Sequence, residues 1–197
     1  RALGAFGHCR NSYGQSENLN QSHLGIGLWR ALARPSGEGA LRKIMSEVLF
    51  YHLEQQALEQ ALPLLLDATM KRGWKAVVQA GSQERVQALD SHLWTFRDDA
   101  FLPHAANGDA RFTEHADSQP IWLTDEDETP NGADVLFLVD GAERAAIDGF
   151  KRTVFMFDGR DEDNVARARA RWSELKEAGH ELTYWQQSAD GKWEQKA

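Results

Sequence analysis

The sequence predicts a three-layer α/β fold, with a mostly parallel sheet flanked by helices on both faces. Short apolar runs rich in β-branched and aromatic residues alternate along the chain with stretches of helical apolar spacing, which is the order that βαβ units require. The run at 134–139 is apolar at every position after its first residue. Such a run is typical of a parallel strand that is covered on both faces, so helices are expected on both sides of the sheet.

The first predicted elements are a strand at 48–53 and a helix from Leu58 to Met70. The strand is short and rich in β-forming residues, and the helix keeps its apolar spacing until Gly73 ends it. Pro63 falls inside the helical pattern. Because proline is best tolerated in the first turn of a helix, the alternative is a helix that begins near Pro63.

A second strand is predicted at 75–80, and a helix follows it at once. Gly81 and Ser82 open this helix, which runs to about Leu93, and the Ser82 hydroxyl is expected to cap its first turn. Residues 94–108 contain a proline and an Asn-Gly pair, which are signals of a loop. We therefore predict a loop over this range.

The second half of the chain supplies the remaining strands and one long helix. Its apolar runs predict four strands, at 120–124, 134–139, 152–157 and 180–186. The acidic stretch 125–132 is expected to form a turn. A helix begins at Asp161, where acidic residues favour the positive end of the helix dipole, and it ends at Gly179.

Residues 1–44 differ in composition from the rest of the chain. They carry six basic and two acidic residues, a net charge of +4, so the overall charge of −8 leaves −12 for the remainder. They show no sustained period of 2 or 3.6, and we expect a disordered extension or upstream sequence included by a misplaced start. The α/β domain is then expected to span 45–197. A regulatory tail that binds a partner is the alternative for 1–44.

The bulk composition excludes several classes of protein. Apolar residues make up 42% of the chain, enough for a hydrophobic core, and the net charge of −8 argues against a broad nucleic-acid footprint. The single cysteine, Cys9, cannot form an internal disulfide, which favours a cytoplasmic protein. No apolar stretch is long enough to span a membrane and no secretion-signal pattern is present, so no membrane partner is expected.

Sequence motifs for nucleotide binding, metal binding and covalent catalysis are missing. The patterns G-x-x-x-x-G-K-[ST] and, after a strand, G-x-G-x-x-G are both absent. None of the seven histidines forms an i,i+4 pair, and no serine lies in a G-x-S-x-G motif. We therefore expect no nucleotide, metal or other cofactor, and no catalytic residues.

Asp140 and Asp158 are the acidic residues that best suit a catalytic role, because each follows an apolar strand. The carboxyl ends of parallel strands are where ligands bind, and paired carboxylates there can hold Mg²⁺. A Mg²⁺-dependent phosphotransfer or hydrolase domain is therefore the alternative function. The simpler interpretation is a turn followed by a helix cap at Asp161, since no lysine or threonine signature completes a catalytic set.

The helix at 161–179 carries the most informative pattern. At about 100° per residue, four residues fall within an arc of roughly 60°: Val165, Arg169, Trp172 and Lys176. The adjoining arc, expected to face the sheet, holds Ala168, Leu175 and Ala178. The first arc suits an acidic, apolar-tipped peptide, because Arg169 can pair with a carboxylate while the Trp172 indole offers apolar area. An ordinary amphipathic helix with Trp172 in the core is the alternative.

A second aromatic group surrounds Trp94 and Phe101, after the helix that ends near Leu93. If these side chains are exposed, they form the wall of a binding pocket. Plain core packing under a loop is the alternative.

Seven short segments in fixed order and spacing carry a family resemblance. They are Phe50–Leu53, Ala88–Trp94, Phe101–His104, Gly132–Leu136, Phe157–Asp161, Ala168–Trp172 and Ala178–His180. Through them the chain, from Met45 to about Lys196, resembles the chi subunit of bacterial DNA polymerase III. Residues 1–44 have no counterpart in this resemblance.

The resemblance implies a non-catalytic accessory of the clamp-loader assembly, with a nucleotide-binding-like topology but no nucleotide site. It implies two partners, the psi subunit and the acidic, phenylalanine-ended C-terminal tail of single-stranded DNA-binding protein. Arg169 and Trp172 match the basic and aromatic tail-binding positions of the family, and Lys176 matches a further basic position. Trp94 and Phe101 match loop aromatics that line the same area.

The sequence departs from the family pattern at three of these positions. Trp172 stands where some members have tyrosine, which preserves an aromatic plane. Ser173 and Val165 stand where some members have lysine, and we expect this to weaken the electrostatic part of tail binding. The psi-binding surface cannot be placed residue by residue. Direct binding of single-stranded DNA through Trp172 and the arginines is a weaker third possibility, which the charge of −12 disfavours.

Overall fold

The computed structural model describes residues 46–197, and the predictions made for 1–44 and for a start at Met45 lie outside this range. Its strands are β1 (Glu47–Leu53), β2 (Ala76–Gln79), β3 (His104–Ala106), β4 (Ile121–Thr124), β5 (Val135–Leu138), β6 (Arg152–Asp158), β7 (Glu181–Gln187) and β8 (Trp193–Gln195). Its helices are α1 (Leu58–Lys71), α2 (Gln83–Thr95), the 3₁₀ helix η1 (Thr113–Ser118) and α3 (Glu162–Glu177). No helix of this part of the chain is long and apolar enough to cross a membrane.

The strands form one sheet in the order β3-β4-β2-β5-β6-β1-β7-β8. All neighbours pair in parallel except β7 and β8, which are antiparallel. The predicted three-layer α/β fold with a mostly parallel sheet is therefore confirmed. Every residue of β5 is buried, as its continuous apolar run predicts.

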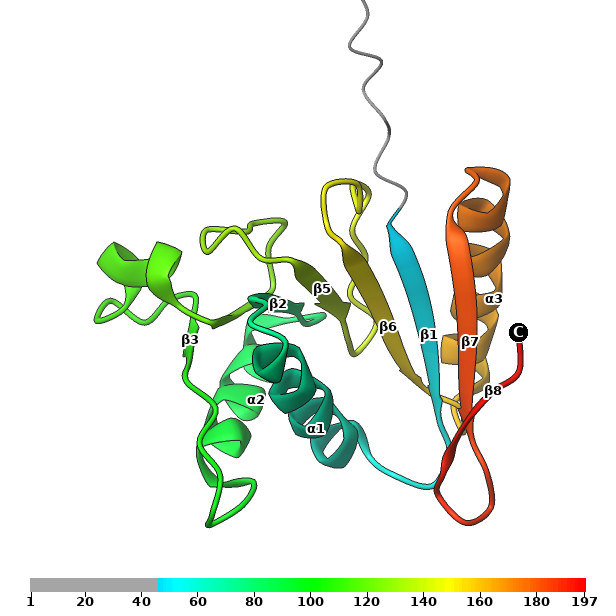
Figure 1. Ribbon diagram of the computed structural model, residues 1–197, viewed down its shortest axis with the longest axis horizontal. Coiled ribbons are helices and arrows are strands. Elements are labelled where there is room, and N and C mark those ends of the chain that lie inside the picture. The colour runs from blue at the N-terminus through cyan, green and yellow to red at the C-terminus, as the bar shows by residue number, and fades with distance from the viewer. Residues whose placement is uncertain (1–45) are drawn as a thin grey trace, which may run out of the picture. The chain divides into compact units, whose positions relative to one another are not determined.

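The direction of each crossover decides which face of the sheet a helix covers. The chain passes from β1 through α1 to β2 and from β2 through α2 to β3, both toward the β3 edge, whereas it passes from β6 through α3 to β7 toward the opposite edge. Because parallel crossovers are right-handed, opposite directions place the helices on opposite faces. Figure 1 shows α1 and α2 together over the half of the sheet that holds β2, and α3 beside β7 in the other half.

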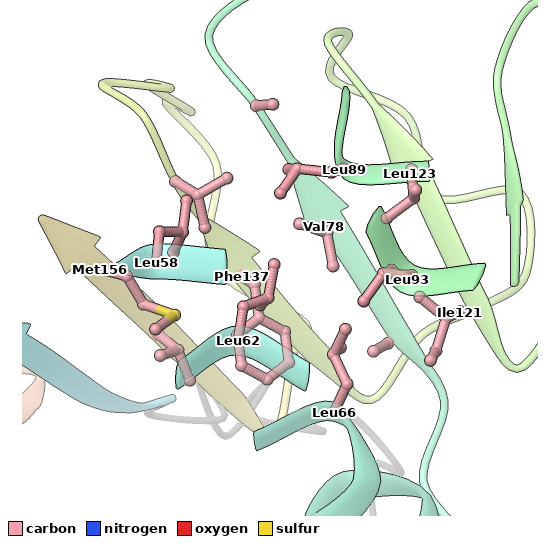
Figure 2. Close-up of a cluster of buried hydrophobic side chains, with 14 of the residues drawn as sticks. Leu58, Leu62, Leu66, Val78, Leu89, Leu93, Ile121, Leu123, Phe137 and Met156 are labelled. Atoms are coloured by element: carbon pink, nitrogen blue, oxygen red, sulfur yellow. The ribbon is translucent and has the colours of Figure 1, made fainter. Parts of the chain in front are cut away.

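Each face has its own apolar core. On the α1 and α2 face, leucines of both helices pack on alternate residues of the strands, and Figure 2 shows Leu62 and Leu93 among them. On the other face, Leu175 of α3 packs with residues such as Phe50 and Leu136. Phe50 and Leu136 are both fully buried. The two cores together fix the sheet between its helices, which holds the strand ends and α3 in defined positions.

Helix α1 begins at Leu58, so the alternative of a start near Pro63 is wrong. A proline at position 63 cannot donate a backbone hydrogen bond to the carbonyl of Glu59 one turn earlier. The His92 ring of α2 replaces that donor, with its Nε2 2.7 Å from the Glu59 carbonyl oxygen. Because a carbonyl only accepts, Nε2 carries the proton. Pro63 is therefore tolerated inside α1 through a contact that the sequence pattern does not show.

Two short strands were not predicted. β3 lies within the range predicted as a loop, and Trp94 and Thr95 of that range continue α2. β3 has three residues and pairs only with β4, so its pattern is too short to recognise. β8 has only three residues, of which Glu194 and Gln195 are polar, and it depends on its pairing with β7 across a turn.

The ends of α3 follow their sequence signals. The Asp161 carboxylate accepts hydrogen bonds from the backbone N–H groups of Asp163 (2.9 Å) and Asn164 (3.2 Å), as an N-cap does. At the other end Gly179 has a φ of +86°, which a residue without Cβ adopts at least cost. Ala178, predicted to face the sheet, is instead exposed, because the helix ends before it at Glu177.

Candidate functional site on helix α3

The side of α3 nearest β7 brings together five of the residues singled out from the sequence. They are Val165, Arg169, Trp172, Ser173 and Lys176, named here the α3 edge. Their spacing places them on one side of the helix at 3.6 residues per turn. The ring of Trp172 lies against Tyr184 of β7, which identifies the strand that this side faces.

Trp172 lies at the border between core and solvent, as its position on the helix predicts. Its ring meets the buried Phe50 ring edge-on at a centroid distance of 5.1 Å and the Tyr184 ring at 5.9 Å. Phe50 in turn stacks on Phe155 at 4.8 Å. The indole is half-buried, so it both anchors α3 to the sheet and leaves apolar surface for a partner.

The basic side chains of α3 differ in their partners. Arg167 donates to the Asn164 side chain at 2.7 Å, and Arg171 pairs with a glutamate one turn further on. Within residues 46–197, the side chains of Arg169 and Lys176 form neither a hydrogen bond nor an ion pair with another residue. Both are exposed. The α3 edge therefore carries two positive charges that no carboxylate of the described fold neutralises.

Ser173 and Val165 supply little charge to the α3 edge, as the departures from the family pattern imply. The Ser173 hydroxyl donates to the Arg169 carbonyl at 3.2 Å, a bond within the helix. Val165 is half-buried and apolar. Arg169 and Lys176 must therefore provide the positive charge of this surface.

Trp94 and Phe101 lie elsewhere, so the expectation that they line the same area is wrong. They come from the end of α2 and the segment before β3, on the α1 and α2 face and at the far edge of the sheet from β7. Their exposed fractions are 51% and 68%, and their ring centroids are 5.9 Å apart. They form a separate exposed aromatic patch, named here the α2 patch.

Tyr184 of β7 adjoins the α3 edge, although it was not singled out from the sequence. It contacts Trp172, and the charge of Arg169 acts on its hydroxyl group. The alternation of side chains along β7 places Tyr184 on the same face as Leu182 and Gln186. Nothing in the sequence, however, gives the register that sets Tyr184 opposite Phe50.

The two aspartates of the alternative function also lie near one another. Asp140 and Asp158 both line a crevice of about 230 Å³ at the carboxyl ends of the strands. Asp140 pairs with Arg85 at 2.8 Å and Asp158 pairs with Arg160 at 2.7 Å. The hydrogen bond from Arg160 lowers the pKa of Asp158. Each carboxylate is thus neutralised by an arginine, and no group of three or more metal-binding side chains occurs in residues 46–197.

A larger cavity of about 580 Å³ lies on the opposite side of α3 from the α3 edge. Leu138, Phe155 and Ala168 contribute apolar surface to it. Two of its arginines hold the surrounding loops: Arg144 donates to the Glu128 carbonyl at 3.1 Å, and Arg171 donates to the Arg144 carbonyl at 3.0 Å. These bonds give the two arginines structural roles, so the α3 edge remains the better candidate for a binding site.

Comparison with known proteins identifies relatives of most of the chain. The family model described as "DNA polymerase III chi subunit, HolC" matches residues 45–183, well over half of the chain. A curated relative, "Probable DNA polymerase III subunit chi" of Rickettsia prowazekii (strain Madrid E), is 27% identical over 115 residues, which cover 58% of this chain and 67% of that protein. The family match contains all of α3 and ends one residue before Tyr184.

Proposed function

This chain belongs to the DNA polymerase III chi subunit family, and we propose that it is a non-catalytic accessory subunit of the clamp-loader assembly in cytoplasmic DNA replication. In this role it links the polymerase to single-stranded DNA-binding protein by holding the acidic C-terminal tail of that protein on the α3 edge. Membership of this family supports a role as a subunit of DNA polymerase III. Binding of the tail, and the residues that bind it, are our proposal.

One observation carries this proposal. Arg169 and Lys176 flank the half-buried Trp172 and have no ion-pair partner within residues 46–197, in a chain whose net charge is −8. An acidic body with a local positive spot attracts an acidic segment to that spot and repels it elsewhere. A carboxylate can accept two parallel hydrogen bonds from the Arg169 guanidinium, while an apolar side chain packs on the indole beside it.

The test is a titration of a fluorescent acidic tail peptide into the full chain. Arg169→Ala and Trp172→Ala should each weaken binding by about tenfold or more, because they remove a charge-assisted hydrogen bond and an apolar anchor. Arg167→Ala is the matched control, since Arg167 is on the same helix but faces away from the α3 edge and should leave the affinity unchanged. Added salt should weaken binding of the wild-type chain.

Trp172 also packs on Phe50, so circular dichroism must show that each variant is folded. If folded Arg169→Ala and Trp172→Ala chains bind the peptide as tightly as the wild type, the site is wrong. If the wild-type chain does not bind the peptide at all, the proposed function is wrong.

We propose further that the α2 patch binds the second partner that the family resemblance implies, the psi subunit. Trp94 and Phe101 are two of the three large apolar side chains most exposed among the described residues, and they lie side by side. Exposed aromatic residues that cluster on a rigid surface are typical of protein interfaces. Phe101→Ser should abolish co-purification with a psi subunit while leaving the fold intact.

The alternative of a Mg²⁺-dependent enzyme remains testable. The arginine partners of Asp140 and Asp158 argue against a metal at these carboxylates, because a cation would have to displace Arg85 and Arg160. Isothermal titration with Mg²⁺ and Mn²⁺ separates the two functions. Heat of binding that Asp140→Asn abolishes would support the enzyme and count against the accessory role.

A further inference from the structure

His104 is a buried histidine beneath the exposed α2 patch. Its side chain has no exposed surface, and its ring lies against the Trp94 ring with the centroids 4.7 Å apart. His104 is the first residue of β3 and follows the buried Leu102 by two positions. The imidazole therefore belongs to the layer on which the patch rests.

Both nitrogens of this ring face oxygen atoms that accept hydrogen bonds. Nδ1 lies 2.6 Å from the carbonyl oxygen of Leu102. Nε2 lies 3.2 Å from the carbonyl oxygen of Asp90 and 3.4 Å from Oδ1 of the same residue. A neutral imidazole has one N–H group, so one of its nitrogens would point a lone pair at these oxygens. The imidazolium form has two N–H groups and satisfies both sides.

The two contacts of the ring join the two segments that carry the α2 patch. Leu102 adjoins Phe101, and Asp90 lies one turn before Trp94 on α2. The contact of Nδ1 is local, whereas the contact of Nε2 crosses to a helix residue 14 positions earlier in the chain. The Nε2 contact therefore helps to set the position of Phe101 relative to Trp94.

The charges around His104 favour the imidazolium form. Asp90 supplies the carboxylate beside Nε2, and an indole attracts a positive charge within about 6 Å of its ring, as Trp94 does here. Arg111 also acts on the charge of Asp90, but its ion pair is with Asp109 at 2.7 Å. The residue that β4 places opposite His104 is uncharged. Burial opposes the charge of the ring, so the ring can release its second proton as the pH rises.

We propose that His104 positions the α2 patch through its doubly protonated form, so that the arrangement of Trp94 and Phe101 changes with pH between about 5 and 8, the range in which histidine titrates. In the imidazolium form Nε2 donates to Asp90 and holds the segment of Phe101 against α2. When this proton passes to water, Nδ1 keeps its shorter contact and Nε2 loses its hydrogen bond. The effect on partner binding rests on the proposed function of the α2 patch, but the positioning role does not.

The experiment is fluorine NMR of the full chain labelled with fluorotryptophan, recorded between about pH 5 and 8. The Trp94→Phe variant identifies the Trp94 signal by its loss. In the wild type this signal should shift with pH along a single titration curve. NMR of the ring nitrogens of His104 should show two N–H groups at the acidic end of the same curve and one at the basic end.

Two variants and a control separate positioning from general packing. His104→Asn keeps a donor toward Leu102 but has no second nitrogen, so its Trp94 signal should stay fixed. Asp90→Asn removes the carboxylate and offers an N–H group to Nε2, so the neutral ring is satisfied and the shift should require a lower pH. Because Asp90 is partly exposed, this variant tests the proposal even if His104→Asn does not fold. His115→Asn, at an exposed position of η1, should keep the wild-type curve.

A Trp94 signal that does not respond to pH overturns the inference, and so does an unaltered curve in folded His104→Asn or Asp90→Asn. Binding of psi is measured separately. Psi should bind the wild type about three- to tenfold more weakly at the basic end than at the acidic end, with no such difference in His104→Asn, because one hydrogen bond of the patch is lost. If Trp94 follows the protonation of His104 but psi does not bind at all, the proposed function of the α2 patch fails and the positioning role of His104 stands.

Discussion

Arg85 connects three separate parts of the fold through one guanidinium group. From α2 it donates to Glu59 of α1 and to Asp140 after β5, both at 2.8 Å. Asp140 has a φ of +51°, a left-handed conformation that aspartate tolerates better than most residues. All three side chains are about one-third exposed, so solvent screening limits the contribution of each pair.

We expect the contribution of Arg85 to depend on pH. Its hydrogen bond lowers the pKa of Glu59 below the ordinary value of 4.5. A carboxyl with a lowered pKa stabilises the fold above its ordinary pKa, and that stabilisation is lost as the pH falls through the lowered value. Arg85→Met should therefore reduce the free energy of unfolding by roughly 0.5–1 kcal/mol at neutral pH and by almost nothing near pH 2.

Urea unfolding at the two pH values measures this difference. Arg97→Met serves as the control, because the ion pair of Arg97 is with the neighbouring and largely exposed Asp99, and its loss should have the same small effect at both pH values. An equal loss for Arg85→Met at both pH values would show that Arg85 stabilises the fold by packing and not through Glu59 and Asp140.

Whole elements were predictable where their signals lie within one continuous segment. Helix α3 was placed from its Asp161 cap, its Gly179 stop and its apolar spacing, and these signals are confirmed. β8 was not predictable, because it depends on a contact with another strand, and for α1 the sequence predicted a start at Leu58 but could not exclude one near Pro63. β8 exists through its pairing with β7, and α1 continues through Pro63 because His92, from another helix, meets the carbonyl that the proline leaves free.

The contact between His92 and α1 leads to a test by a thermodynamic cycle. His92→Leu leaves the Glu59 carbonyl without its donor and should cost about 1–3 kcal/mol of unfolding free energy. In Pro63→Ala the backbone N–H of position 63 supplies the missing helical hydrogen bond. The same His92→Leu change should then cost at least about 1 kcal/mol less than it does in the wild type. Equal costs in both backgrounds, measured by denaturant unfolding, would falsify this role of His92.

At the scale of the whole molecule, topology decides which predicted site residues meet. The helical period alone placed Arg169 and Trp172 on one side of α3, and in the structure both lie near Tyr184. The grouping of these residues with Trp94 and Phe101 failed, because right-handed crossovers in opposite directions put α2 and α3 on opposite faces of the sheet. Tyr184 was missed for a related reason, since only strand pairing brings it to Trp172.

Two surfaces on opposite faces should bind their partners independently. Trp94→Ser combined with Phe101→Ser changes the α2 patch and should leave the affinity for the tail peptide within about twofold of the wild type. The helices α2 and α3 pack on opposite faces of the sheet, and substitutions at distant sites act additively. Trp172→Ala should in turn leave psi binding unchanged.

Titrating the peptide with and without saturating psi tests the same independence in the wild-type chain. Both partners should bind at the same time, each with the affinity that it has alone. Competition between them, or a loss of tail binding in the doubly substituted α2 patch, would mean that one continuous site spans both faces, and the separation of the two surfaces would have to be abandoned.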